Sequence, residues 1–210
     1  MNVTDSFNNG SIGSEDSHKF SYFRRPIQNT RPCVTATPVD IFKYIIGPVA
    51  RGRTKELRSI KDKNEARKYK ATQFDYCTFS GVFSTRNKSG LLQPSNLLCL
   101  DFDHVPDLDS LKERLLSDPL FETELLFVSP SGDGLKWVVA VDYQGFDHGQ
   151  YFDAVRNYLI GEGIPEPDGA CRDITRSCFL PYDPDVFINP KYGIHKENYF
   201  SAWEVPECPF

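Results

Sequence analysis

Residues 97–104, Leu-Leu-Cys-Leu-Asp-Phe-Asp-His, place four apolar residues directly before two aspartates separated by one residue. An uninterrupted apolar run of this kind is typical of a strand buried on both faces. Because side chains alternate along a strand, Asp101 and Asp103 should project from the same face, with Cα atoms about 7 Å apart. Two ionised carboxylates so placed repel each other, and a bound Mg²⁺ or Mn²⁺ would relieve the repulsion. The pair therefore predicts a metal site, and a strand that simply enters a solvated loop is the alternative.

The 210-residue chain carries a formal charge of −5 and six cysteines. Its length suits one domain with a core, or two small lobes. The acidic balance argues against general coating of nucleic acid but allows a local basic groove. No Cys-x-x-Cys pair occurs, so the cysteines are expected to be small apolar side chains of a reduced, cytoplasmic protein. The sequence has neither an apolar leader nor an apolar run of about 18 residues, so we expect no secretion and no contact with a membrane.

Hydrophobic patterning along the chain predicts an α+β domain. Residues 1–18 have the composition of a disordered leader, and residues 196–210 that of a tail or linker. Thr37 and Pro38 have the pattern of a helix start. After the central strand, we expect a helix, the two strands of a hairpin, a helix and a final strand, over residues 107–118, 124–128, 135–143, 150–160 and 177–181.

Residues 51–70 contain nine Lys or Arg against three acids, in a chain that is acidic as a whole. One interpretation is a solvated amphipathic helix. The other is a face that tracks a nucleic-acid backbone beside the metal site. The residues predicted for this nucleic-acid contact are Lys61, Lys63, Arg67 and Lys68.

A second candidate motif, Ser-Pro-Ser-Gly-Asp-Gly-Leu-Lys, begins at Ser129 and ends at Lys136. Gly132 and Gly134 permit a turn whose exposed N–H groups would bind an anion. Ser129 and Ser131 add hydroxyl donors, and Lys136 adds a positive charge suited to phosphate. The motif predicts a phosphate-binding loop, with a plain hairpin turn as the alternative.

A third segment, residues 168–181, again combines acids with arginines. A third carboxylate near the first pair would complete a two-metal site of the kind that supports phosphoryl transfer. Asp173 is the predicted third acid, because Arg176 follows it and can bind phosphate or steady the acids. Asp168 is the reserve candidate, and a polar surface loop is the alternative.

Together these motifs resemble those of the archaeo-eukaryotic primase superfamily, the primase-polymerases, and within it the VirE N-terminal-domain family of mobile-element and phage-related proteins. The similarity covers roughly residues 40–190. It rests on the Asp-x-Asp pair, the Ser/Gly-rich loop ending in a basic residue, and an acid before a later strand. Many primases have histidine where this chain has Lys136, a difference that concerns catalysis more than nucleotide binding.

The resemblance implies an RRM-like primase palm over about 93–195, packed on a smaller N-terminal α/β unit over about 19–92. It implies a DNA or RNA primase-polymerase, a nucleotidyltransferase that replicates a mobile element or phage-like genome. Asp101, Asp103 and Asp173 would hold catalytic Mg²⁺ or Mn²⁺. The implied partners are nucleoside triphosphates, single-stranded nucleic acid and a helicase-like ATPase.

Two other functions fit parts of the sequence. A catalytically inactive palm-like module would bind nucleotide or nucleic acid with the same motifs. A haloacid-dehalogenase-type phosphatase would use Asp101 as its nucleophile and Asp103 as its acid/base. That fold needs more Rossmann-like chain than the roughly 107 residues that follow Asp103.

Overall fold

The structure, a computed structural model, describes residues 18–143 and 145–194, so the predicted leader and tail lie outside it except for His18. The fold is α+β, as the sequence predicts, and the described strands pair antiparallel. The helices are α1 (Pro38–Ile46), α2 (Arg51–Ser59), α3 (Lys63–Gln73), α4 (Leu108–Leu116) and α5 (His148–Gly161). The strands are β1 (Phe20–Phe23), β2 (Val34–Ala36), β3 (Tyr76–Thr78), β4 (Gly81–Phe83), β5 (Leu91–Pro94), β6 (Leu97–Phe102), β7 (Thr123–Val128), β8 (Leu135–Ala140), β9 (Cys178–Phe179) and β10 (Phe187–Ile188).

The sheet that carries the first motif has the strand order β10-β7-β8-β6. Strands β6 and β7 both pair antiparallel with β8, so they run parallel to each other, and α4 connects them. This arrangement is a split β-α-β unit. Parallel β6 and β7 end at the same edge of the sheet, and the Asp-x-Asp pair and the Ser129 loop therefore meet there.

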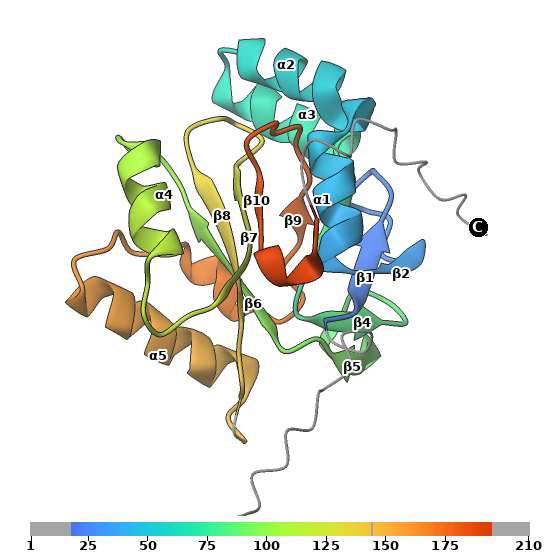
Figure 1. Ribbon diagram of the computed structural model, residues 1–210. Helices are drawn as coiled ribbons and strands as arrows, with labels where there is room; N and C mark the ends of the chain where they lie inside the picture. Colours follow the sequence, from blue (N-terminus) through green and yellow to red (C-terminus); the bar gives the residue numbers. More distant parts are fainter. Residues whose placement is uncertain (1–17, 144, 195–210) are drawn as a thin grey trace, which may run out of the picture.

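Helices α4 and α5 cover one face of this sheet (Figure 1). Alternate side chains of β6 and β8, such as Leu100 and Trp137, are buried in a cluster with Leu115 of α4 and Phe152 of α5. The other face packs on α1, where Leu97 and Phe127 join the core formed with the first sheet. Because Asp101 follows Leu97 and Cys99 in the alternation, its side chain lies between the two layers rather than under α4 and α5.

The first sheet has the order β2-β1-β3-β9. Strand β9 corresponds to the final strand predicted over 177–181, but it pairs with β3 here rather than with β6. Strand β10 instead completes the site-bearing sheet, at its far edge beside β7. In the ferredoxin-like order of an RRM the last strand lies beside the first. The strands β6, β8 and β7 follow that order, and β10 does not.

The basic segment forms two helices, α2 and α3, rather than one. Asp62 begins the second helix, because its carboxylate accepts a hydrogen bond from the Glu65 backbone N–H at 2.8 Å. The two helices lie side by side at one end of the molecule (Figure 1). The predicted start of α1 is confirmed: Thr37 and Asp40 form a capping box, with proline in the first turn.

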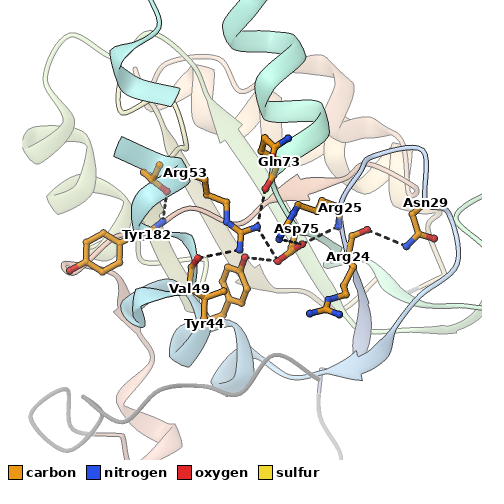
Figure 2. Close-up of polar contacts among 10 residues, drawn as sticks. Arg24, Arg25, Asn29, Tyr44, Val49, Arg53, Gln73, Asp75 and Tyr182 are labelled. Atoms are coloured by element: carbon orange, nitrogen blue, oxygen red, sulfur yellow. Dashed lines mark hydrogen bonds and ion pairs between the residues drawn. The ribbon is translucent and has the colours of Figure 1, made fainter. Parts of the chain in front are cut away.

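A buried carboxylate, Asp75, holds this helical end to the sheets (Figure 2). Its Oδ2 atom accepts hydrogen bonds from Tyr44 Oη of α1 at 2.8 Å and from Arg53 Nη1 of α2 at 3.3 Å. Its Oδ1 atom accepts from the Arg25 backbone N–H at 3.0 Å. Arg53 also donates to the Gln73 carbonyl at the end of α3, at 2.9 Å. One carboxylate therefore fixes α1, α2, α3 and the chain after β1 together.

Most cysteines behave as predicted. Cys77, Cys99, Cys171 and Cys178 have free thiols and are wholly or partly buried. Cys33 differs from the expectation because it is disulfide-bonded. Among the described residues, no helix combines the length and the apolar character that crossing a bilayer requires.

We predict that Asp75→Ala lowers the free energy of unfolding by about 3–5 kcal/mol, because it leaves the Arg53 guanidinium and the Tyr44 hydroxyl buried without their acceptor. Urea denaturation followed by circular dichroism measures the loss. The matched control is Arg25→Ala, whose side chain is 46% exposed and 3.6 Å from Asp75; it should cost less than about 1 kcal/mol. Similar losses in both variants would contradict the network's role.

Candidate metal and phosphate site

Three carboxylates meet at the edge where β6 and β7 end. Asp101, Asp103 and Asp168 each offer one oxygen within 4.8 Å of the others. Asp101 is the penultimate residue of β6, and Asp103 directly follows the strand. Asp168 precedes the short 3-10 helix Gly169–Arg172 and is held by its backbone N–H, which donates to the Asp101 carbonyl at 2.7 Å. A backbone hydrogen bond thus fixes the spacing of the two more buried acids.

The buried acid of the three, Asp101, is paired through only one of its two carboxylate oxygens. Lys136 lies directly across from it on β8, and its ammonium pairs with Asp101 Oδ2. Asp101 Oδ1 is buried and has no hydrogen-bond partner among the described residues. Burial raises the pKa of the Asp101 carboxyl, and the Lys136 ammonium opposes that shift. Burial would lower the pKa of Lys136, but the nearby Asp101 carboxylate outweighs it and raises the pKa.

This pairing changes the role expected for Lys136. The sequence suggests a mobile cation for phosphate, whereas the structure shows a side chain only 12% exposed and committed to Asp101. The β6–β8 register decides this, because it aligns Asp101 with Lys136 and Leu100 with Trp137.

The third acid of the cluster is Asp168, the reserve candidate, and not Asp173. Asp168 accepts hydrogen bonds from the Ala170 N–H at 3.0 Å and from Arg176 Nη2 at 2.7 Å. Asp173 lies outside the group of three, and its carboxylate accepts from the backbone N–H and the hydroxyl of Thr175. The short 3-10 helix separates the two aspartates and turns the chain away, which the sequence pattern alone does not reveal.

The Ser129–Gly134 loop is a tight hairpin turn packed on the end of β6. Gly134 is required there, since a Cβ atom would lie 2.3 Å from the Phe102 carbonyl oxygen. The N–H groups of Ser129 and Gly132 are used within the turn, donating to the carbonyls of Gly134 and Ser129. The Ser129 hydroxyl is buried without a partner, while Ser131 is exposed. The loop therefore offers fewer free N–H donors than the predicted phosphate cradle.

The basic helices reach this site through two residues that the sequence did not single out. Arg58 of α2 donates to the carbonyls of Pro130 and Ser129, each at 3.2 Å. Lys70, in the last turn of α3, is partly buried near the acids. Burial and the neighbouring Lys136 ammonium lower the pKa of Lys70, and the carboxylates of Asp101 and Asp103 oppose this.

The four residues predicted to contact nucleic acid lie on or just before α3, and all of them are exposed. They are Lys61, Lys63, Arg67 and Lys68. The helices that carry this exposed basic surface border the acidic cluster, with Arg58 on the hairpin turn and Lys70 beside the acids. The sequence shows Lys70 as the last lysine of the basic segment, but it does not indicate that this lysine is partly buried.

These residues fit a divalent cation. The donor set consists of carboxylate oxygens, which Mg²⁺ and Mn²⁺ prefer. Asp103 is exposed, and Asp101 Oδ1 is a buried acceptor with no donor supplied by the protein. A cation there would contact this unpartnered oxygen, with open positions for water or phosphate oxygens. Asp101, Asp103 and Asp168 are the residues that would hold it.

We predict that Asp168→Asn and Asp103→Asn each weaken Mn²⁺ binding by at least about tenfold, because each removes one charged ligand. Isothermal titration calorimetry measures the affinity. Asp173→Asn is the matched control and should bind Mn²⁺ like the parent protein. The opposite pattern, with loss only in Asp173→Asn, would return the third ligand to Asp173.

Comparison with known proteins bears on the same part of the chain. No curated protein and no solved structure matches the chain. The profile of the BT4734-like, N-terminal domain family matches residues 68–187. That range includes the three clustered acids, Lys70, the hairpin loop and Arg176. More than half of the sequence lies within the match, and the chain belongs to the BT4734-like, N-terminal domain family.

Proposed function

We propose that this protein is a metal-dependent nucleotidyltransferase of the primase-polymerase type, acting on nucleoside triphosphates and single-stranded nucleic acid in replication of a mobile element or phage-like genome. The observation that carries the proposal is the acidic cluster at the end of β6. Asp101 and Asp103 from one strand, with Asp168 beside them, supply the three carboxylates that a two-metal site needs. The split β-α-β unit resembles the core of a primase palm.

In this proposal the acids hold Mg²⁺ or Mn²⁺, and bound metal supplies positive charge to the triphosphate and to the attacking oxygen. Arg176, already paired with Asp168, is placed to orient that acid and to donate to phosphate. The exposed basic surface of α3 is placed to bind the backbone of a template strand. A helicase-like ATPase remains the partner suggested by the family resemblance.

One observation favours a second candidate function. Lys136 occupies Asp101 Oδ2, so an internal cation already takes part of the metal's place. This arrangement also suits a catalytically inactive palm-like module that binds nucleotide or nucleic acid. The phosphatase alternative gains no such support, because its Rossmann-like sheet has parallel strands, whereas β6 and β8 are antiparallel.

We predict template-dependent nucleotide incorporation in the presence of Mn²⁺ or Mg²⁺, and its loss in Asp103→Asn and Asp101→Ala. Asp103 is the sharper test, because it is exposed and its replacement leaves the buried Lys136 pair intact. Asp109→Ala, an exposed acid on α4, is the control and should retain activity. Incorporation assays on primed and unprimed single-stranded templates provide the measurement. Binding of metal and nucleotide without any incorporation would favour the inactive module.

A separate prediction concerns the template strand. Changing Lys61, Lys63 and Lys68 together to Glu should weaken single-stranded DNA binding, because contacts with the phosphate backbone are lost. The slope of log K against log salt should fall by about 2, from roughly 0.7 per phosphate contact. Fluorescence anisotropy at several salt concentrations measures the slope, with Mn²⁺ titration as the check that the metal site persists. An unchanged slope would leave α3 as an ordinary solvated helix.

A further inference from the structure

Among the residues that the structure describes, Lys70 is the cation beside the acidic cluster whose ammonium has no hydrogen bond or ion pair. The Nζ atom instead lies 6.0 Å from the centroid of the Phe179 ring on β9. Partial burial without a direct ion pair disfavours an ammonium group. Filling space or pairing with a protein acid therefore does not explain a lysine at this position.

The neighbours of Lys70 are charged on both sides. Asp101 and Asp103 attract its ammonium, while Lys136 and Arg176 repel it. Lys136 is paired with Asp101, and Arg176 with Asp168. Lys70 is thus the cation of this group whose donors are not already engaged.

The charges of the cluster predict what it binds. The positive charges of Lys70, Lys136 and Arg176 equal in number the negative charges of Asp101, Asp103 and Asp168. A divalent cation alone adds uncompensated positive charge, and a triphosphate alone adds a negative charge of about −4. Two divalent cations and one triphosphate together restore neutrality. The site is therefore matched to a metal–triphosphate complex rather than to either component alone.

We propose that Lys70 is a phosphate-binding residue that contacts the triphosphate of the incoming nucleotide, and that metal and triphosphate bind interdependently. This inference rests on the proposed function of the site and assigns to Lys70 the role that the sequence suggested for Lys136. A lysine ammonium suits the task because it is a compact charge with three donors on a flexible chain. Lys70 lies on α3 and Arg176 lies in the chain before β9, so the two cations approach the acids from different segments.

Calorimetric titration of Lys70→Met tests the proposal with two probes. With Mn²⁺ alone, binding should be equal to or tighter than in the parent protein, because a competing cation is gone. With α,β-methylene nucleoside triphosphate analogues in saturating Mn²⁺, binding should be about tenfold weaker. In EDTA, the parent protein should bind the analogues at least about tenfold more weakly than in Mn²⁺. Lys88→Met, an exposed lysine before β5, is the matched control and should alter neither affinity.

The two affinities of Lys70→Met separate phosphate binding from a structural role. Phosphate binding predicts equal or tighter binding of Mn²⁺ alone and weaker binding of the triphosphate analogue. A lysine needed only for folding would, when replaced, weaken both probes together and lower the melting temperature by several degrees, and that result would overturn the proposal. Equal triphosphate affinity in Lys70→Met and the parent protein would also overturn it while leaving the proposed function intact. If the parent protein binds no triphosphate analogue even with Mn²⁺, the proposed function fails, and the role of Lys70 fails with it.

Discussion

The buried carboxylate of Asp75 is the contact on which the placement of the site depends. It lies two residues after α3 and binds Tyr44 of α1 and Arg53 of α2, while Arg53 also holds the last carbonyl of α3. A buried charge is tolerated only when several donors satisfy it. These donors come from separate helices, so neutralising Asp75 also fixes the helices relative to the sheets. Lys70, near the end of α3, owes its position beside Asp101 to this anchor.

Charge also governs the site itself, through competition for Asp101. One oxygen of this carboxylate is paired with Lys136, and the other is buried without a donor. The described residues therefore supply a charge partner that keeps the acid in place, but no donor for its second oxygen. Such an arrangement keeps the metal-free fold intact and still leaves attraction for a cation. The same pairing bears on both candidate functions, since Lys136 already takes part of the place that a metal would have beside Asp101.

The sequence predicts features that depend on neighbours in the chain. The buried strand before Asp101, the helix start at Thr37, the α4 helix and the hairpin after Val128 each follow from local patterns, and the structure contains all of them. Local patterns do not reveal which elements these features contact. Whether Asp168 or Asp173 joins the acids depends on a hydrogen bond between residues 67 positions apart, from the Asp168 N–H to the Asp101 carbonyl.

Long-range pairing likewise decides the remaining differences. Lys136 faces Asp101 only because of the β6–β8 register, and β9 joins β3 rather than the sheet that carries the site. A two-residue strand has too little pattern to indicate its partner. From the sequence, Lys70 cannot be told apart from the solvated lysines of its segment, because nothing in its local composition indicates burial. The types of residue at the site were therefore predictable, but their contacts required the fold.

The family match begins at residue 68, within α3, and this boundary has a consequence for relatives of the protein. Arg25, Tyr44 and Arg53, which bind the Asp75 carboxylate, precede it, as do strands β1 and β2. A relative that shares only the matched region would lack these donors from the preceding chain for any acid at the position of Asp75. It would need an apolar replacement for that acid or a different preceding segment to neutralise it. The part of this chain that the family profile matches is thus smaller than the unit whose charges are balanced.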